Sequence, residues 1–234
     1  MILFKSDKEK TDKSSAVLAV LFTLLAVTIV LLLGQAMALS NTLAEQSHYK
    51  ELGKENLSQI KAQINTPQDV IKFRDANFHY ITDIAQYGKE EYVASMQTFY
   101  NHSWNGDCED FAITIAGLLA DNGYAPTTLS LVRNASSQEK AEYGMSNSSG
   151  FLGHRIYVYQ ENGKWGAIGV SSSEDRAPVY ENMTSLVASL NTGENSQYPY
   201  QLAQVNPLKN LSAEYPSSLW INGIGDLSSR DALR

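Results

Sequence analysis

The feature that most constrains this chain is an apolar run near its N-terminus. Ala16 to Leu33 contains no charged residue, and a helix rising about 1.5 Å per residue would carry this run over about 27 Å. This length is close to the roughly 30 Å hydrocarbon thickness of a bilayer. We therefore predict a transmembrane helix over residues 15–34, preceded by a cytoplasmic tail over residues 1–14.

A cleaved signal peptide is the alternative interpretation of the same run. Ala36-Met37-Ala38 resembles a small-x-small cleavage site. The apolar region of a signal peptide is usually only about 7–15 residues long, which is shorter than the run observed here. The sequence therefore favours an uncleaved signal-anchor.

The lysines that flank the run predict its orientation. Positions 5, 8, 10 and 13 are lysines, whereas within about twenty residues after the span only Lys50 and Lys54 occur. Because positive charge stays inside, we expect a single-pass protein of the cell membrane with a cytoplasmic N-terminus and an extracytoplasmic C-terminal domain. The lone cysteine, Cys108, fits an oxidising exterior, since no internal disulfide can form.

The formal net charge of −7 argues against a nucleic-acid partner, since no Lys- or Arg-rich stripe is present. The expected partners are the lipid bilayer, through residues 15–34, and a protein or peptide substrate outside the cell. Sequons that suit an external glycoprotein begin at Asn56, Asn101, Asn134, Asn147, Asn182 and Asn210.

Three segments follow the anchor. Residues 35–65 are polar with apolar residues at helical spacing, which predicts a juxtamembrane helix or stalk. Thr66-Pro67 supplies an N-cap and a first helical residue, and begins the domain that we place at residues 66–194. From Asn195 the chain is rich in Pro, Asn and Ser, so residues 195–234 are interpreted as a C-terminal extension.

The cysteine lies at the predicted start of a helix. An apolar run over residues 113–120 follows Cys108 and ends before Gly123, which predicts a helix of about four turns with Asp107 or Asn105 as its N-cap. Unpaired N–H groups in a first helical turn favour a thiolate, the form that attacks carbonyls. The alternative is a buried cysteine that acts as a small hydrophobe.

Alternating residues predict strands after this helix. Residues 127–132 alternate, and so do residues 154–159, which are joined to a return strand over residues 165–170 by the hairpin signal Asn162-Gly163. A helix is predicted over residues 183–190. His154 opens the second strand, and an imidazole there could take the proton of the Cys108 thiol wherever the helix packs end-on against that strand.

These residues resemble the cysteine motif of the transglutaminase-like cysteine peptidase superfamily. The motif is Gly106-Asp107-Cys108-Glu109-Asp110, followed by Phe111-Ala112. The resemblance covers roughly residues 66–190 and includes further positions upstream and downstream: Tyr80, Asp83, Tyr87-Gly88, Met96-Gln97-Thr98, Gly153-His154 and Lys164-Trp165-Gly166.

The resemblance implies an α+β fold with a papain-like core, in which the nucleophile helix packs on an antiparallel sheet. Cys108 would be the nucleophile, His154 the general base, and the Cys108 backbone N–H a donor to the oxyanion. The family usually completes the triad with an aspartate shortly after the tryptophan, but Gly166 to Gly169 contains no carboxylate. The substitutes within reach are Ser171, Ser172, Ser173, Glu174 and Asp175.

The function expected from this reading is hydrolysis or transfer at an amide bond of proteins or cell-wall peptides, through a Cys108 thioester. The alternative is a catalytically silent binding module that recognises a peptide or cell-wall polymer in the same cleft. No cofactor is implied, and one cysteine with scattered histidines shows no metal-ligand spacing. His48, His79 and His102 are interpreted as surface or packed residues, and the acids beside Cys108 as complements to the helix dipole.

Overall fold

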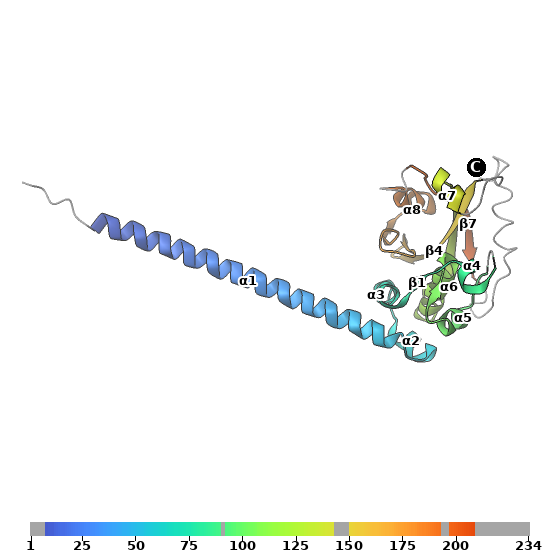
Figure 1. Ribbon diagram of the computed structural model, residues 1–234, viewed down its shortest axis with the longest axis horizontal. Coiled ribbons are helices and arrows are strands. Elements are labelled where there is room, and N and C mark those ends of the chain that lie inside the picture. Colours follow the sequence, from blue (N-terminus) through green and yellow to red (C-terminus); the bar gives the residue numbers. More distant parts are fainter. Residues whose placement is uncertain (1–7, 90–91, 143–149, 193–196, 209–234) are drawn as a thin grey trace, which may run out of the picture. The chain divides into compact units, whose positions relative to one another are not determined.

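The computed structural model describes residues 8–89, 92–142, 150–192 and 197–208 (Figure 1). The chain divides into two compact units, residues 1–48 and residues 49–234. The predicted sequons at Asn147 and Asn210, and most of the C-terminal extension, lie outside the described residues.

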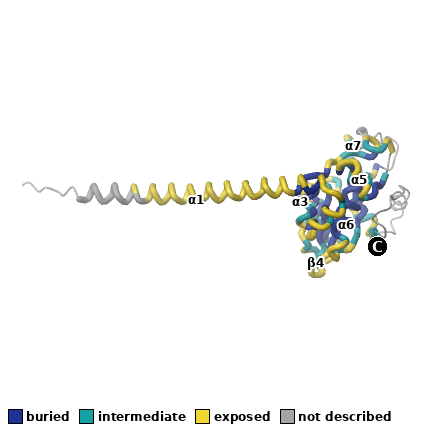
Figure 2. Tube along the Cα trace, turned by 90° about the horizontal axis from the view of Figure 1, so that it is seen from below, coloured by how far each residue is buried: buried dark blue, intermediate teal, exposed yellow. Residues whose placement is uncertain are grey.

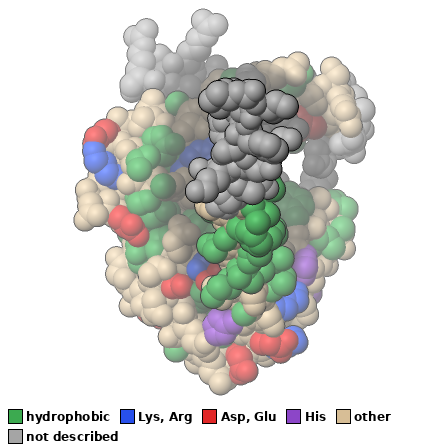
Figure 3. All heavy atoms as spheres, turned by 90° about the vertical axis from the view of Figure 1, so that its left-hand side faces the viewer, with side chains coloured by type: hydrophobic (Ala, Val, Ile, Leu, Met, Phe, Trp, Pro, Cys, Tyr) green, Lys and Arg blue, Asp and Glu red, His purple; other side chains and the backbone are tan. Residues whose placement is uncertain are grey.

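Helix α1 (Lys8–Leu52) makes up the described part of the first unit as far as His48. Its last turn, from Tyr49, belongs to the second unit. From Val20 onward this helix has a mean hydropathy of 2.4 in its most apolar window, and none of that window is buried. Its large apolar side chains lie exposed from Leu18 to Leu43; Figure 2 shows this stretch as exposed, and Figure 3 shows apolar side chains of the helix in green. The helix is thus long and apolar enough to cross a membrane, a test that a signal sequence also passes.

Helix α1 ends where its backbone meets another helix. A side chain at Gly53 would bring a Cβ to 2.0 Å from the Asn77 Oδ1 atom, and the Asn77 amide donates to the carbonyl oxygens of Tyr49 and Phe73. Tyr49 and Leu52 are buried in the core of the second unit. The segment predicted as a stalk therefore contributes to the packed body.

Short helices follow along the chain. Helix α3 begins at Pro67 after the N-cap Thr66, as the sequence predicted. The side chains of Thr66 and Asp69 also form a capping box. A short parallel ladder connects β1 with β2 and places the loop before Cys108 beside the end of α3. The bounds are α2 (Leu57–Gln63), α3 (Pro67–Asn77), β1 (His79–Tyr80), α4 (Asp83–Tyr87), α5 (Met96–Asn101), β2 (Asn105–Gly106) and α6 (Cys108–Leu119).

The rest of the described chain forms an antiparallel sheet of five strands in the order β6-β5-β4-β3-β7. The hairpin between β4 and β5 turns at Asn162 and Gly163, which both have positive φ, as the Asn-Gly signal predicted. The bounds are β3 (Thr127–Asn134), α7 (Ser137–Glu142), β4 (Phe151–Glu161), β5 (Lys164–Ile168), β6 (Arg176–Tyr180), α8 (Met183–Leu190) and β7 (Gln201–Pro207).

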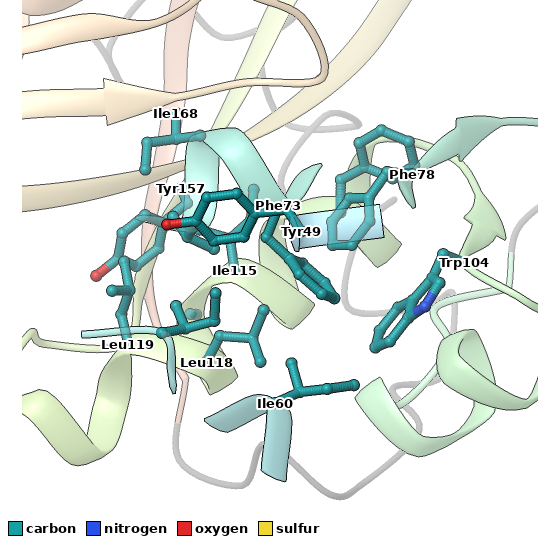
Figure 4. Close-up of a cluster of buried hydrophobic side chains, with 14 of the residues drawn as sticks. Tyr49, Ile60, Phe73, Phe78, Trp104, Ile115, Leu118, Leu119, Tyr157 and Ile168 are labelled. Carbon is teal, nitrogen blue, oxygen red and sulfur yellow. The ribbon is translucent and has the colours of Figure 1, made fainter. Parts of the chain in front are cut away.

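Each face of the sheet carries its own core. On one face, Tyr157, Tyr159 and Ile168 join α6, α3 and α2 in an aromatic-rich cluster (Figure 4). On the other face, Ile156 and Val158 pack with α8. Helix α6 is buried at every position and is the central helix of the body (Figure 2).

The predicted mixed α+β class with an antiparallel sheet is confirmed. The packed body is larger than the predicted range 66–194, because Ile60 and Ile64 are fully buried in its core and β7 pairs with β3. Residues 201–207 of the predicted C-terminal extension therefore form a strand of the sheet. Composition hid this strand, because Pro- and Asn-rich flanks surround its short alternating pattern.

Candidate functional site

Cys108 is the first residue of α6 and is only 8% exposed. Asp107 occupies the N-cap, as predicted, although its side chain makes no capping hydrogen bond. The Cys108 thiol donates to Glu109 Oε2, with 3.1 Å between sulfur and oxygen. The sulfur also accepts from the backbone N–H of Arg155, the residue after His154. The thiol therefore lies directly beside the stretch of β4 that carries the predicted base.

The electrostatic surroundings of the thiol differ from the expectation. Burial raises the pKa of Cys108 well above its ordinary value, and the charges of Glu109 and Asp107 raise it further. The prediction that the helix N-terminus favours a thiolate is therefore wrong for this conformation. The dipole contributes only near the helix end, and here it is outweighed by desolvation and by adjacent carboxylates.

His154 lies in β4 and meets one of the predicted third residues. Its Nε2 atom is 2.9 Å from Glu174 Oε1, an ion-pair distance, although the alignment falls short of a hydrogen bond. Burial alone would raise the pKa of Glu174. The contact with His154, the Val170 N–H and the charge of Arg74 outweigh burial and hold that pKa below its ordinary value. Glu174 is thus a buried carboxylate that favours its charged form.

Among the other predicted third residues, none described here takes this place. The Ser171 hydroxyl pairs with that of Ser173, 2.8 Å away, and both serines are exposed together with Ser172. The Asp175 carboxylate turns to Arg74 instead. The sequence had left five adjacent residues as candidates for the third member of the triad. In the turn after β5, Glu174 is the one of these five that contacts His154.

Glycine permits the approach of Glu174. A Cβ at Gly169 would lie 2.3 Å from Glu174 Oε2 and 2.4 Å from its Cβ, so any larger residue would displace the carboxylate. The Val170 N–H then donates to Oε2 at 2.8 Å, which leaves Oε1 for His154. The Gly169 position is therefore a requirement of the Glu174–His154 contact.

Strand alternation gives Cys108 and His154 different approaches to β4. His154 shares its side of the strand with Ile156 and Val158, whereas Tyr157 and Tyr159 face α6. Cys108 reaches the strand at its backbone, beyond the end of β5. The thiol thus contacts the backbone of Arg155, the residue of β4 that directly follows His154.

Tyr200 is a site residue that the sequence reading missed. Its ring stacks on His154, with 5.5 Å between ring centroids, and the Arg133 guanidinium carbon lies over the Tyr200 ring, 5.7 Å from its centroid. Burial raises the pKa of Tyr200 and the charge of Glu174 adds to the rise, which together outweigh the lowering effect of Arg133. The Asn191 side chain fixes the Tyr200 backbone through two hydrogen bonds. The alternation of β7 was the only available signal.

Carboxylates from α4 and the start of α6 form an acidic cluster, which we define as Asp83, Asp107 and Asp110. One oxygen from each lies within 4.8 Å of the others. Burial is the main cause that raises their pKa values, to about 6 for Asp83, about 11 for Asp107 and about 8 for Asp110. Such a cluster either shares protons or could hold a divalent cation, for which carboxylate oxygens are suitable ligands.

The absence of a metal site had been expected from cysteine and histidine spacing alone. That reasoning missed the acidic cluster because its members are separated in sequence and meet only in the fold. Gly106 allows the meeting, since a Cβ there would lie 2.3 Å from Asp110 Oδ2. The remaining histidines, His48, His79 and His102, are exposed.

Neither a family model nor a curated protein sequence matches this chain. The functional argument therefore depends on the geometry of the site.

Proposed function

We propose that this chain is a membrane-anchored, outward-facing cysteine hydrolase or acyltransferase of the transglutaminase-like kind, built on a papain-like core. The observation that carries the proposal is the contact between His154 and Glu174 beside a cysteine at a helix N-terminus. Acyl transfer requires a base that is oriented by a carboxylate and lies close to the nucleophile; His154 contacts the Glu174 carboxylate, and Cys108 contacts the backbone of the next residue of β4, Arg155.

The proposed reaction begins with attack of the Cys108 sulfur on an amide carbonyl carbon. His154 takes the thiol proton as the C–S bond forms, and Glu174 stabilises the positive ring. The Cys108 backbone N–H, unpaired in the first turn of α6, donates to the oxyanion. His154 then returns the proton to the departing amine, and the C–N bond breaks. Water or another amine attacks the thioester and restores the thiol.

General-base attack suits the neutral thiol found here. Because burial and acidic neighbours keep the pKa of Cys108 high, the site does not store a thiolate. Proton transfer to His154 during attack avoids the need for one, since the proton leaves only as the carbonyl is engaged. Displacement of the thiol from Glu109 is the accompanying step.

The membrane part of the proposal depends on charge placement. Helix α1 is apolar enough for a span, and the lysines before it predict that the body lies outside the cell. A tethered enzyme on that side would act on proteins or cell-wall peptides near the membrane surface.

A second candidate function is a silent binding module on the same scaffold. It is favoured by the burial of Cys108 and by its hydrogen bond to Glu109, which together disfavour the reactive form. In that case Glu174 and Tyr200 would serve only to order the cleft.

The test uses the full chain in detergent micelles with p-nitrophenyl acetate as acyl donor. Since the chain holds a single cysteine, a burst of nitrophenolate equal to the protein concentration reports acylation of Cys108. We expect this burst in the native chain, none in Cys108→Ser, and a much slower one in His154→Gln. A native chain without a burst would support the binding module.

A further inference from the structure

The side chain of Arg74 is one of the largest in the described chain that is fully buried, with 1% of the residue exposed. It comes from α3, far in sequence from the loop between β5 and β6, yet it ends on that loop. A buried guanidinium needs partners for its donors. The acceptors of these hydrogen bonds show which part of the fold Arg74 holds in place.

All five N–H directions of the guanidinium are engaged. The Nη1 atom donates to the Gly169 carbonyl at 2.8 Å and to Asp175 Oδ1 at 2.6 Å. The Nη2 atom donates to Asp175 Oδ2 at 2.8 Å, which completes a bidentate pair. The Nε and Nη2 atoms also donate to Asp75 Oδ1, at 2.9 and 2.7 Å.

These bonds close the loop that presents Glu174. Gly169 and Asp175 are the first and last residues of the segment between β5 and β6, and Arg74 binds both. Within the loop, Asp175 Oδ1 accepts the Gly169 N–H at 3.3 Å, and Glu174 Oε2 accepts the Val170 N–H. The carboxylate of Glu174 is thus oriented by a frame whose two ends meet on one guanidinium.

We propose that Arg74 is a positioning residue for the Glu174–His154 pair, acting through Asp175 and Gly169. It fixes the loop so that Glu174 Oε1 reaches His154 Nε2, and the ring then carries its proton on Nε2 and leaves Nδ1 to accept the thiol proton. This inference rests on the proposed function for its catalytic meaning, but the contact that it explains does not.

Lysine cannot replace this arrangement. An ammonium keeps the positive charge, but it cannot span both Asp175 oxygens and the Gly169 carbonyl with a planar fork. The Arg74→Lys variant therefore tests whether the positive charge alone is sufficient or whether the planar guanidinium is required. Arg176 offers a matched control, because it also binds this loop, at the Ser173 and Asp175 carbonyls, but touches neither the Asp175 carboxylate nor Gly169.

The experiment records ¹⁵N spectra of the histidine rings in the full chain, labelled at histidine, in detergent micelles at pH 8. His154→Gln assigns the His154 signals among the four histidines of the chain. In the native chain we expect the Nε2–H tautomer to predominate. In Arg74→Met we expect mixed tautomers, in Arg74→Lys an intermediate state, and in Arg176→Met the native signature.

Removal of Arg74 alone leaves the half-buried Asp175 carboxylate without its guanidinium partner, which endangers the fold. The double variant Arg74→Met/Asp175→Asn removes both charges, and its circular dichroism and melting temperature report whether it is folded. A folded double variant with the native His154 signature would overturn the proposal. Loss of the signature would support it.

Acylation of Cys108 is measured on the same samples. Where the Nε2–H tautomer is lost, we expect the burst to slow on the order of tenfold, the low end of the loss seen when an outer hydrogen-bond partner of a metal-binding histidine is removed. A native chain that shows the tautomer but no burst would leave the positioning role intact and refute the proposed function. A native chain that shows the burst but not the Nε2–H tautomer would refute the positioning role of Arg74 and leave the proposed function intact.

Discussion

Glu174, which faces His154, and the acidic cluster at the start of α6 have opposite electrostatic states. Glu174 is buried, yet its pKa is held below the ordinary value because His154, Arg74 and a backbone N–H face it. In the acidic cluster, Asp83 and Asp110 each accept a backbone N–H, but burial and the charge of Glu109 outweigh these bonds, and the pKa values are raised. Burial is therefore not what separates them. The difference is the charge supplied by the neighbouring elements.

The comparison assigns a role to each side. The negative charge of Glu174 is stabilised by Arg74 and a backbone N–H, and the carboxylate can stabilise a protonated imidazole at His154. On the other side, burial and then the carboxylates of Glu109 and Asp107 disfavour a thiolate at Cys108, and the raised pKa values of the acidic cluster mean that its carboxyl groups retain protons. Reactivity of Cys108 should thus depend on the first side for assistance and on the second for restraint, and each side can be altered separately.

The largest effect should follow removal of the charge on Glu174. We expect Glu174→Gln to slow acylation of Cys108 by roughly 10²-fold, toward the low end of general acid–base contributions, because thiols lean on such a charge less than serine does. Nitrophenolate burst rates measure this. Glu181→Gln, which removes a surface carboxylate paired with Lys164, is the matched control and should leave the rate unchanged.

The acidic cluster should dominate the pH dependence of stability above pH 5. A carboxyl whose folded pKa is raised contributes stability that is full below its unfolded pKa of about 3.9 and is lost as pH rises through its folded pKa. For Asp83 and Asp110 these values are about 6 and about 8. The melting temperature should therefore fall between pH 5 and pH 9. Glu174, with a lowered pKa, contributes stability above its unfolded pKa of about 4.3 that is lost only in more acidic solution.

Asp110→Asn should flatten this profile, because the amide keeps an oxygen for the Ala94 N–H and removes the titrating charge. We expect its melting temperature at pH 9 to exceed that of the native chain by a few degrees, at about 2–4 °C per kcal/mol for a body of this size. Asp121→Asn, at a surface pair with Lys61, should follow the native profile. Identical profiles for Asp110→Asn and the native chain would mean that the cluster does not store charge repulsion.

Two glycines allow the comparison to be tested, because the Glu174 carboxylate packs against Gly169 and the Asp110 carboxylate packs against Gly106. Gly169→Ala should displace Glu174, and Gly106→Ala should displace Asp110 and crowd the Phe99 ring. We expect each to cost about 1–3 kcal/mol in the free energy of unfolding, measured by denaturant titration, but only Gly169→Ala should slow acylation beyond that loss. Gly34→Ala, with nothing within 4 Å of the added carbon, should change neither quantity.

A divalent cation offers a smaller, reversible change on the acidic side. If calcium binds the cluster, it stabilises the folded chain by mass action, by about 2.7 kcal/mol at a hundred times its dissociation constant. We expect calcium to raise the melting temperature at pH 8, chelator to reverse the rise, and Asp83→Asn to abolish it. A native chain indifferent to calcium would show that the cluster balances its charge with protons alone.

Local patterns predicted the elements of this site, but not its electrostatics. Asn162-Gly163, Thr66-Pro67 and the apolar run after Cys108 each specified a turn, a cap or a helix through nearest neighbours. The Glu174 contact was predicted only as one of five choices, because it depends on a turn over Gly169 and on Arg74, a hundred residues upstream in the chain.

The acidic cluster and Tyr200 could not be inferred from spacing. The cluster unites α4 with the start of α6, and Tyr200 reaches His154 only because β7 pairs with β3. For the same reason the helix-dipole argument for Cys108 failed, since the opposing carboxylates and the desolvation arise from tertiary packing.

The most direct test of the central claim is the pH dependence of Cys108 alkylation by iodoacetamide in the full chain, with and without His154→Gln. If His154 acts as a general base, the native chain should be alkylated faster than the variant at every pH below the raised pKa of the Cys108 thiol, because the imidazole takes the proton during attack. Superimposable profiles of the native chain and the variant would show that the imidazole does not act on Cys108 and would contradict the account.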